Sequence, residues 1–144
     1  MTMDPYRAVF IAIAADCPVD AAEVPPARAG GPTVAGLHHA LAAGAPYAWT
    51  HDEVIFRTHL LRSGLDPAAH PVDGQEWRRF FAKGQPCLRA SPLAKRYGGG
   101  FHVDEGGRVA AIPAGSPAYA AHAADPELRQ LKAMRSARAR PAGG

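Results

Sequence analysis

Proline and glycine interrupt this chain so often that no regular element in it can be long. Together they fill 29 of the 144 positions (14 Pro and 15 Gly), and clusters such as Pro25-Pro26 and Gly30-Gly31-Pro32 exclude both helix and strand. A chain of this length fits one domain, which buries roughly two-thirds of its unfolded surface. We therefore expect a single globular domain over residues 1–140, followed by a disordered tail at 141–144.

Local signals predict one strand near the N-terminus and a series of short helices. The run Ala8–Ala14 is short, β-branched and aromatic, which is typical of a buried strand. Thr50 and Glu53 match a capping box, and this favours a helix ending at Gly64 over a strand through the same apolar residues. Further helices are expected at 34–43 after the N-cap Thr33, at 75–83, from Ser91-Pro92 to Tyr97, from Ser116-Pro117, and from Asp125-Pro126 to about Arg138.

A hairpin completes the expected fold. Phe101–Asp104 and Arg108–Ile112 flank the turn Glu105-Gly106-Gly107, a pattern that predicts two antiparallel strands. The fold class indicated is α+β, with one small antiparallel sheet and several short helices packed mainly on one face.

The net positive charge of the chain comes from its C-terminal segment. Residues 1–124 hold eleven Lys and Arg against eleven Asp and Glu, whereas residues 125–144 hold five cations against two acids. Two interpretations remain open: the solvated end of a helix, or an arm that binds nucleic acid or another acidic partner. Because five cations are few for nucleic-acid binding, we favour the solvated helix end. These cations are Arg129, Lys132, Arg135, Arg138 and Arg140.

No targeting signal or membrane span is evident. The apolar run Ala8–Ala15 is at the short end for a signal peptide, Asp4 weakens the positive start that one requires, and nothing approaches a membrane-spanning length. Two cysteines, Cys17 and Cys87, do not make a disulfide framework, and in the cytoplasm, where we expect the protein, both are reduced.

The densest chemistry lies between Lys83 and His102. This run holds a thiol, four cations, a Tyr, a Ser, a His and a glycine triplet, and no acid. Cations without local acidic partners, next to a glycine-rich turn and a helix start, suit an anion. The candidate ligand-binding residues are Arg89, Ser91, Lys95, Arg96 and Gly98. The alternative is that these cations pair with acids elsewhere in the fold or face solvent.

Three residues of the same run are candidate catalytic groups: Cys87, Tyr97 and His102. Arg89, two residues after Cys87, is a cation that would favour the thiolate, and His102 is the nearest histidine in sequence that can act as its base. The alternative for Cys87 is a small buried apolar side chain. No metal set is indicated, because adjacent His38 and His39 point apart on a helix. No cofactor motif is present either.

Several phrases occur in a familiar order. They are DCPV from Asp16, EVPP from Glu23, TVAG from Thr33, GQPCLRASPLAKRYG from Gly84 and KAMRSARA from Lys132. Over nearly its whole length the chain resembles a family of small bacterial proteins catalogued only as a domain of unknown function. The resemblance implies a single domain of this size and no particular activity. The glycine segment of the family that it resembles usually carries an aromatic residue between two glycines, where this chain has Gly99; if that ring lines a pocket, the pocket of this chain is more open or differently shaped.

We expect a domain that binds an anionic small molecule, a carboxylate or a phosphate, in a pocket around residues 84–102. If it is an enzyme, the cations hold the anion and Tyr97 or His102 moves a proton in a cofactor-free, isomerase-type reaction, with Cys87 as nucleophile or as pocket wall. Two alternatives stay open: a non-enzymatic interaction protein with a basic C-terminal helix, and a redox-responsive protein that uses Cys17 and Cys87. The oligomeric state is left undetermined.

Overall fold

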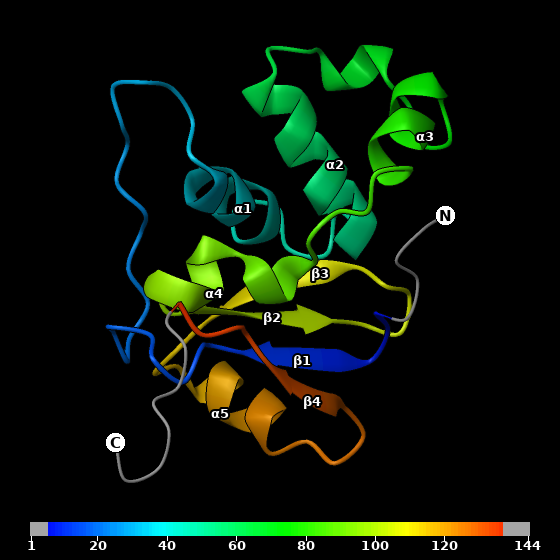
Figure 1. The fold of residues 1–144 in the computed structure, drawn as a ribbon. Helices are drawn as coiled ribbons and strands as arrows, with labels where there is room; N and C mark the ends of the chain where they lie inside the picture. The colour runs from blue at the N-terminus through cyan, green and yellow to red at the C-terminus, as the bar shows by residue number, and fades with distance from the viewer. Residues whose placement is uncertain (1–5, 137–144) are drawn as a thin grey trace, which may run out of the picture.

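The computed structural model describes residues 6–136, and it has the α+β architecture predicted from the sequence (Figure 1). Two 3₁₀ turns, η1 (Pro67–Ala69) and η2 (Leu88–Ala90), accompany the longer elements. In chain order these are β1 (Val9–Ala12), α1 (Val34–Ala42), α2 (His51–Arg62), α3 (Gln75–Phe81), α4 (Pro92–Arg96), β2 (Gly99–Val103), β3 (Val109–Pro113), α5 (Pro117–Ala123) and β4 (Arg129–Lys132).

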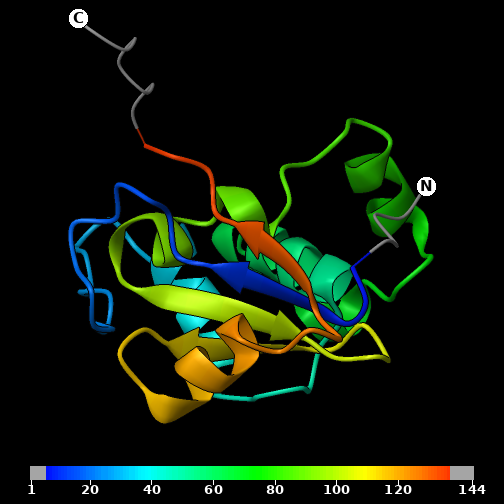
Figure 2. The ribbon, with the colours of Figure 1, turned by 90° about the horizontal axis from the view of Figure 1, so that it is seen from below.

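One four-stranded sheet forms the centre of the molecule. Its strand order is β3-β2-β1-β4, in which β2 is antiparallel to both β1 and β3, and β4 is parallel to β1. The sheet is therefore mixed and not antiparallel as expected. Helices α1 to α4 cover one face, while α5 covers the other (Figures 1 and 2).

The strand β4 replaces the final helix that the sequence predicted, and that prediction was wrong. Asp125-Pro126 does start a turn, in which the N–H of Glu127 donates to Asp125 Oδ1 at 2.9 Å. The chain then extends along β1, with Leu131 opposite Ile11. Pairing with a buried strand satisfies the backbone better than an isolated helix would, and this tertiary effect leaves no local signal. The predicted helix end near Arg138 and the predicted tail at 141–144 lie outside the described residues.

Four other predicted helix starts are confirmed. The Thr33, Thr50, Ser91 and Ser116 side chains each accept an N–H from the first turn of the helix that follows, and Thr50 with Glu53 forms the complete capping box. The hairpin of β2 and β3 is also confirmed, with Phe101 opposite Ala111. Local hydrogen bonds therefore determine where most helices begin.

The two faces of the sheet bury separate apolar clusters. Side chains alternate along β2, so Phe101 and Val103 join the main core under α1 to α4, whereas Gly100 and His102 face α5. The smaller cluster on the α5 face contains Phe10 and Ile112. None of the helices between residues 6 and 136 combines the length and apolar character that a membrane crossing requires.

Candidate functional site

Cys87 lies in the turn that joins α3 to α4, on the helical side of the sheet. The side chain of Gln85 donates to the carbonyl of Phe80 at 2.9 Å and ties this turn to the end of α3. Cys87 then serves as the N-cap of η2. The chain therefore presents a half-buried thiol at the start of a short helical turn, where the backbone N–H of Arg89 favours a negative charge on sulfur.

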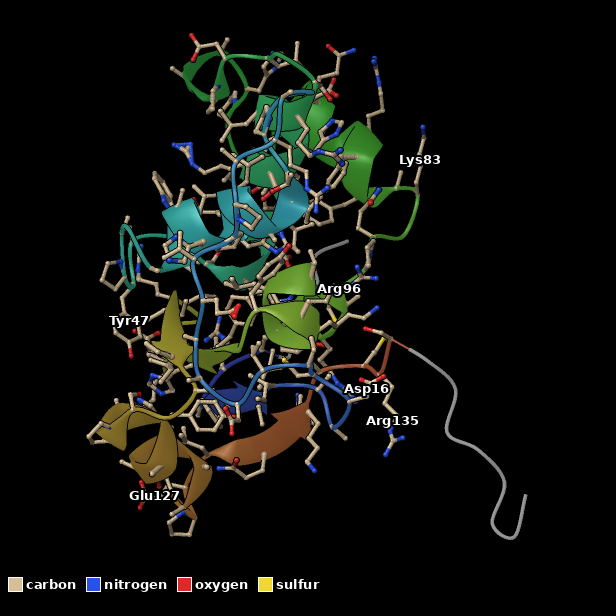
Figure 3. All side chains as sticks on the ribbon, turned by 90° about the vertical axis from the view of Figure 1, so that its left-hand side faces the viewer. Asp16, Tyr47, Lys83, Arg96, Glu127 and Arg135 are labelled. Atoms are coloured by element: carbon tan, nitrogen blue, oxygen red, sulfur yellow. The ribbon has the colours of Figure 1, made fainter. Side chains whose placement is uncertain are left out.

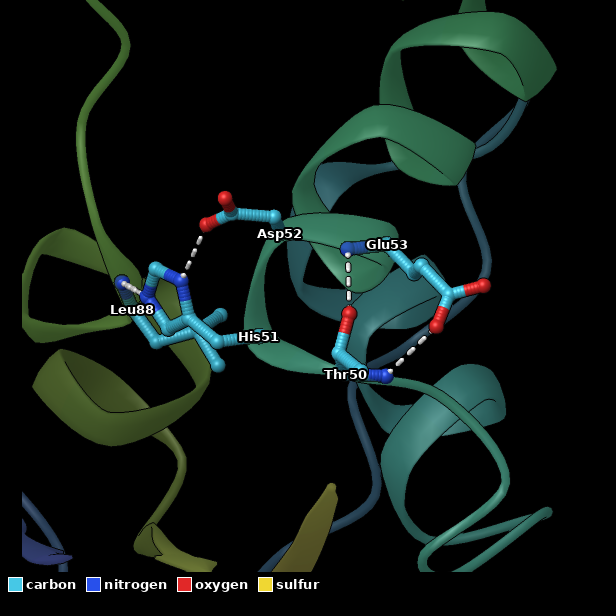
Figure 4. A network of polar contacts seen from close by, with 5 residues as sticks. All are labelled: Thr50, His51, Asp52, Glu53 and Leu88. Atoms are coloured by element: carbon cyan, nitrogen blue, oxygen red, sulfur yellow. Dashed lines mark hydrogen bonds and ion pairs between the residues drawn. The ribbon is translucent and has the colours of Figure 1, made fainter. Parts of the chain in front are cut away.

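The imidazole of His51 reaches this turn from the first residue of α2 (Figure 4). The N–H of Leu88 donates to His51 Nε2 at 3.1 Å, and Nδ1 of the same ring lies 3.1 Å from Asp52 Oδ1. His51 is only 3% exposed, so these two contacts hold the ring in place. In this arrangement Nδ1 carries a proton toward the carboxylate, and Nε2 faces the residues around the thiol.

The surroundings favour the charged form of the thiol. The largest influence on the pKa of Cys87 is a hydrogen bond with His51, which lowers it, whereas burial raises it. Tyr6 and the backbone N–H of Arg89 lower it further. The net result is a fall in the pKa from 9.0 to about 7. Burial lowers the pKa of His51, but the contacts with Asp52 and Cys87 outweigh it and raise the pKa. Both shifts favour a thiolate beside a protonated imidazole, and protonation at Nε2 ends the acceptance of the Leu88 N–H by that nitrogen.

Tyr6 covers the other side of His51. The two rings stack at 4.2 Å between centroids and 9° between planes. Burial, followed by its hydrogen bond to Cys87, raises the pKa of Tyr6 to about 12, so its hydroxyl stays protonated and donates to sulfur. Tyr6 therefore both positions the imidazole and stabilises the thiolate.

Cys87 lines a pocket among the helices, which we call the larger pocket. This pocket has a volume of about 540 Å³ and is enclosed by α1, α2, α3 and the 85–92 segment. Its polar lining includes Thr58, His59, Arg62 and Gln85 beside Cys87, and none of the described lining residues is acidic. The pocket is thus of a size for a small molecule and is suited to a polar or anionic one.

A buried pair of side chains forms another part of the same wall. His38 of α1 lies with Nδ1 2.6 Å from Ser91 Oγ, and this oxygen also accepts the N–H of Leu93. Burial lowers the pKa of His38 to about 4, so the ring is neutral at neutral pH. The Ser91 oxygen accepts the Leu93 N–H, and its own hydrogen has an acceptor in Nδ1; with this assignment the proton of His38 is on Nε2. Within residues 6–136 Nε2 has no hydrogen-bond partner, and His38 is among the residues that line the larger pocket.

Three of the residues predicted to bind or act on a ligand gather at a second, adjoining pocket. Lys95, Arg96 and Tyr97 line a cavity of about 250 Å³ together with Arg28 and the start of α1. Its wall shares Val34, Ala90 and Pro92 with the larger pocket. The central stretch therefore divides between two neighbouring pockets, with Cys87 and Ser91 at one and the cations of α4 at the other.

Arg89 and Gly98 have structural contacts. The guanidinium Nε of Arg89 donates to the carbonyl of Lys132 at 2.7 Å, and the carbonyl of Arg89 accepts the N–H of Met134, so this residue anchors β4. Gly98 adopts a φ of +73°, and a Cβ there would lie 2.8 Å from the carbonyl oxygen of Ala21. The glycine thus admits the 18–32 loop against the end of α4.

His102 lies away from Cys87. Its Nδ1 is 2.7 Å from the hydroxyl of Tyr47, and its ring stacks on His122 of α5 at 4.1 Å. Figure 3 places Tyr47 at one edge of the molecule, away from Arg96 of α4. Burial, followed by the nearby His122, lowers the pKa of His102. The structure therefore brings His51, and not His102, next to the thiol.

Sequence reasoning missed four residues of this site. His51 and Asp52 stand inside the capping-box phrase, Tyr6 precedes the first strand, and His38 stands in a helix, so no local pattern connects any of them with Cys87. Cys17 and Cys87 are both free thiols. Within the described part of the chain, no group of three or more His, Cys, Asp or Glu side chains is arranged to hold a metal ion.

Comparison with known proteins gives a family for the chain. A family model described as "Family of unknown function (DUF6157)" matches residues 1–139. The chain therefore belongs to this family, which confirms the membership in a domain family of unknown function that its sequence phrases predicted. No curated protein and no solved structure matches the chain.

Proposed function

We propose that this member of a family of unknown function is a cofactor-free enzyme that moves a proton within a small anionic substrate, with the Cys87 thiolate as the base. The observation that carries the proposal is a half-buried thiol in a pocket wall, next in the chain to Leu88, whose N–H donates to His51 Nε2 at 3.1 Å. Hydrogen bonds with His51 and Tyr6 lower the pKa of Cys87 to about 7, the range in which a general base is effective at neutral pH.

The reaction needs one base and one hydrogen-bond donor. The thiolate takes a proton from a carbon that bears a hydroxyl group and lies next to a carbonyl group, and the negative charge moves to the carbonyl oxygen. His38 Nε2–H donates a hydrogen bond to that oxygen. The hydroxyl proton then passes to the former carbonyl oxygen, and the Cys87 thiol returns its proton to the former carbonyl carbon, so that the hydroxyl oxygen becomes the new carbonyl oxygen. No atom is lost or gained, so the net change is an isomerisation that needs no external oxidant or water.

The supporting residues have separate roles. His51 and Tyr6 stabilise the thiolate, and Asp52 orients the imidazole. Arg62 is the cation of the larger pocket and balances the charge of an anionic substrate beside the thiolate. The basic C-terminal segment is a weaker basis for function, because Arg129 and Lys132 lie in the edge strand β4 and not on a helix.

Deuterium exchange tests the proposal directly. The protein is incubated in D₂O with a panel of small hydroxy-carbonyl and keto compounds that carry a carboxylate or a phosphate, and exchange at carbon is followed by NMR. We expect catalysed exchange with the unchanged protein and with Cys17→Ala, the matched cysteine control. Cys87→Ala should abolish the exchange. Equal exchange by Cys87→Ala, or a Cys87 thiol that no reagent alkylates at neutral pH, would overturn the proposal.

A further inference from the structure

Three cations surround the smaller pocket beside the Cys87 site. Lys95 and Arg96 come from the last turn of α4, and Arg28 comes from the loop before α1. None of the described lining residues is acidic, and within residues 6–136 no acidic side chain lies at ion-pair distance from any of the three cations. A concave surface with this much uncompensated positive charge attracts an anion.

Backbone donors of α1 face the same pocket. Thr33 caps the helix and its hydroxyl accepts the N–H of Gly36, while Val34 and Ala35 line the cavity. In the described structure the N–H groups of these two residues make no hydrogen bond with protein. They add two donors to the three cations, in the combination by which proteins hold phosphate.

The loop that carries Arg28 is fixed at defined points. The N–H of Glu23 donates to the carbonyl of Tyr97 at 2.9 Å, and Gly98 lets the backbone of Ala21 approach closely. A turn closes at Arg28, whose carbonyl accepts the N–H of Gly31. The contacts at Tyr97 and Gly98 set the loop beside the end of α4, so the three cations are brought together by the fold itself.

The smaller pocket adjoins the larger one, and the two share Val34, Ala90 and Pro92 in their walls. From these observations we infer that the smaller pocket holds the phosphoryl group of the substrate, while the reactive end of the same molecule meets Cys87. The inference rests on the proposed function and specifies its substrate class as a small phosphate ester. Three cations suit a phosphoryl group with two negative charges better than a carboxylate with one.

Binding of inorganic phosphate tests the smaller pocket alone. Isothermal titration calorimetry of the full chain should show binding that is retained in Cys87→Ala. Lys95→Ala and Arg96→Ala should each weaken it by about tenfold or more, since each removes one charge-assisted contact. Lys83→Ala is the matched control, because Lys83 is an exposed lysine that lines neither pocket (Figure 3). It should leave binding unchanged.

Affinity labelling tests the connection between the two pockets. The probes are bromoalkyl phosphates with two to four carbons, whose C–Br bond breaks as the Cys87 thiolate forms an S–C bond and bromide leaves. At one chain length, alkylation of Cys87 should be at least tenfold faster than with the matching bromoalcohol. Inorganic phosphate and Arg96→Ala should each remove the acceleration.

Each result decides for or against the inference. No phosphate binding by the folded protein, or equal binding by Lys95→Ala and the control, overturns it. A bromoalkyl carboxylate that labels as fast as the phosphate overturns the phosphoryl assignment. If iodoacetamide still alkylates Cys87 at neutral pH in those cases, the proposed function stands without the phosphate. If phosphate binds but Cys87 is inert to iodoacetamide, the proposed function fails and with it the assignment of this phosphate to the substrate.

Discussion

The pKa of Cys87 should depend on His51 more than on any other residue. His51→Gln keeps an amide oxygen to accept the Leu88 N–H and an amide nitrogen to face Asp52, but it removes the group that takes up a proton. The pKa of Cys87 falls from 9.0 to about 7, and the hydrogen bond with His51 is the largest favourable cause. If that contact supplies most of the change, the variant should have a midpoint above about 8.

The change in ionised fraction follows from these values. At pH 7 a thiol with a pKa near 7 is about half ionised, and one with a pKa near 8 is about one-tenth ionised. The rate at a single pH understates this difference, because a more basic thiolate is about 2.5-fold more nucleophilic for each unit of pKa. The midpoint of the pH profile is therefore the better measurement.

The assay is the rate of iodoacetamide alkylation of Cys87 from pH 5 to pH 10, followed by mass spectrometry. Tyr6→Phe, which keeps the stacked ring and removes the hydroxyl, should give a smaller upward shift, and circular dichroism verifies that both variants fold. An unchanged midpoint in a folded His51→Gln protein would refute the reasoning, since it would show that the imidazole does not stabilise the thiolate.

Three further predictions concern stability and the phosphate pocket. Burial lowers the pKa of His38 from 6.5 to about 4, so the unfolded chain takes up a proton first as the pH falls. Urea unfolding should therefore show that the free energy of unfolding decreases by up to about 3 kcal/mol between pH 6.5 and pH 4. This decrease should be absent in His38→Gln; an equal decrease in that variant would contradict the prediction. Gly98→Ala should lower the free energy of unfolding by about 1–3 kcal/mol and weaken phosphate binding, because the added Cβ meets the Ala21 carbonyl. Gly64→Ala is the control, since Gly64 has a similar φ of +72° but lies in open space. It should lower the free energy of unfolding by about 1 kcal/mol and leave phosphate binding intact. Arg89→Ala should lower the free energy of unfolding by about 1 kcal/mol through its lost bond to the β4 backbone, with unchanged phosphate affinity; a large loss of affinity would instead place Arg89 in the site.

The helix starts could be predicted because their hydrogen bonds are local. The Thr50 hydroxyl and the Glu53 carboxylate satisfy donors within three residues, so the phrase alone specifies the helix. Asp125-Pro126 carries the same kind of start signal as Ser116-Pro117, yet β4 follows it. What decides between helix and strand there is the pairing of Leu131 with Ile11, 120 positions earlier in the chain, and no local pattern reports such a contact.

In the candidate site too, features that depend on nearby residues could be predicted, and contacts between distant residues could not. Residue type and neighbouring cations pointed to Cys87, but nearness in sequence suggested His102 as its base. Alternation along β2 makes that pairing impossible, since Phe101 packs under the helices and His102 therefore faces α5. His51 approaches the thiol only because α2 packs over the 85–92 segment, where its ring accepts the Leu88 N–H. This contact joins positions 37 apart and depends on the complete fold.

The proposed chemistry depends on a Cys87 thiol that is ionised near neutral pH. The most direct test is the pH at which Cys87 is half ionised in the unaltered protein, measured from the growth of thiolate absorbance near 240 nm, with Cys87→Ala subtracted. We expect a midpoint of about 7. A midpoint near 9.0, the value of a thiol without these contacts, would contradict it.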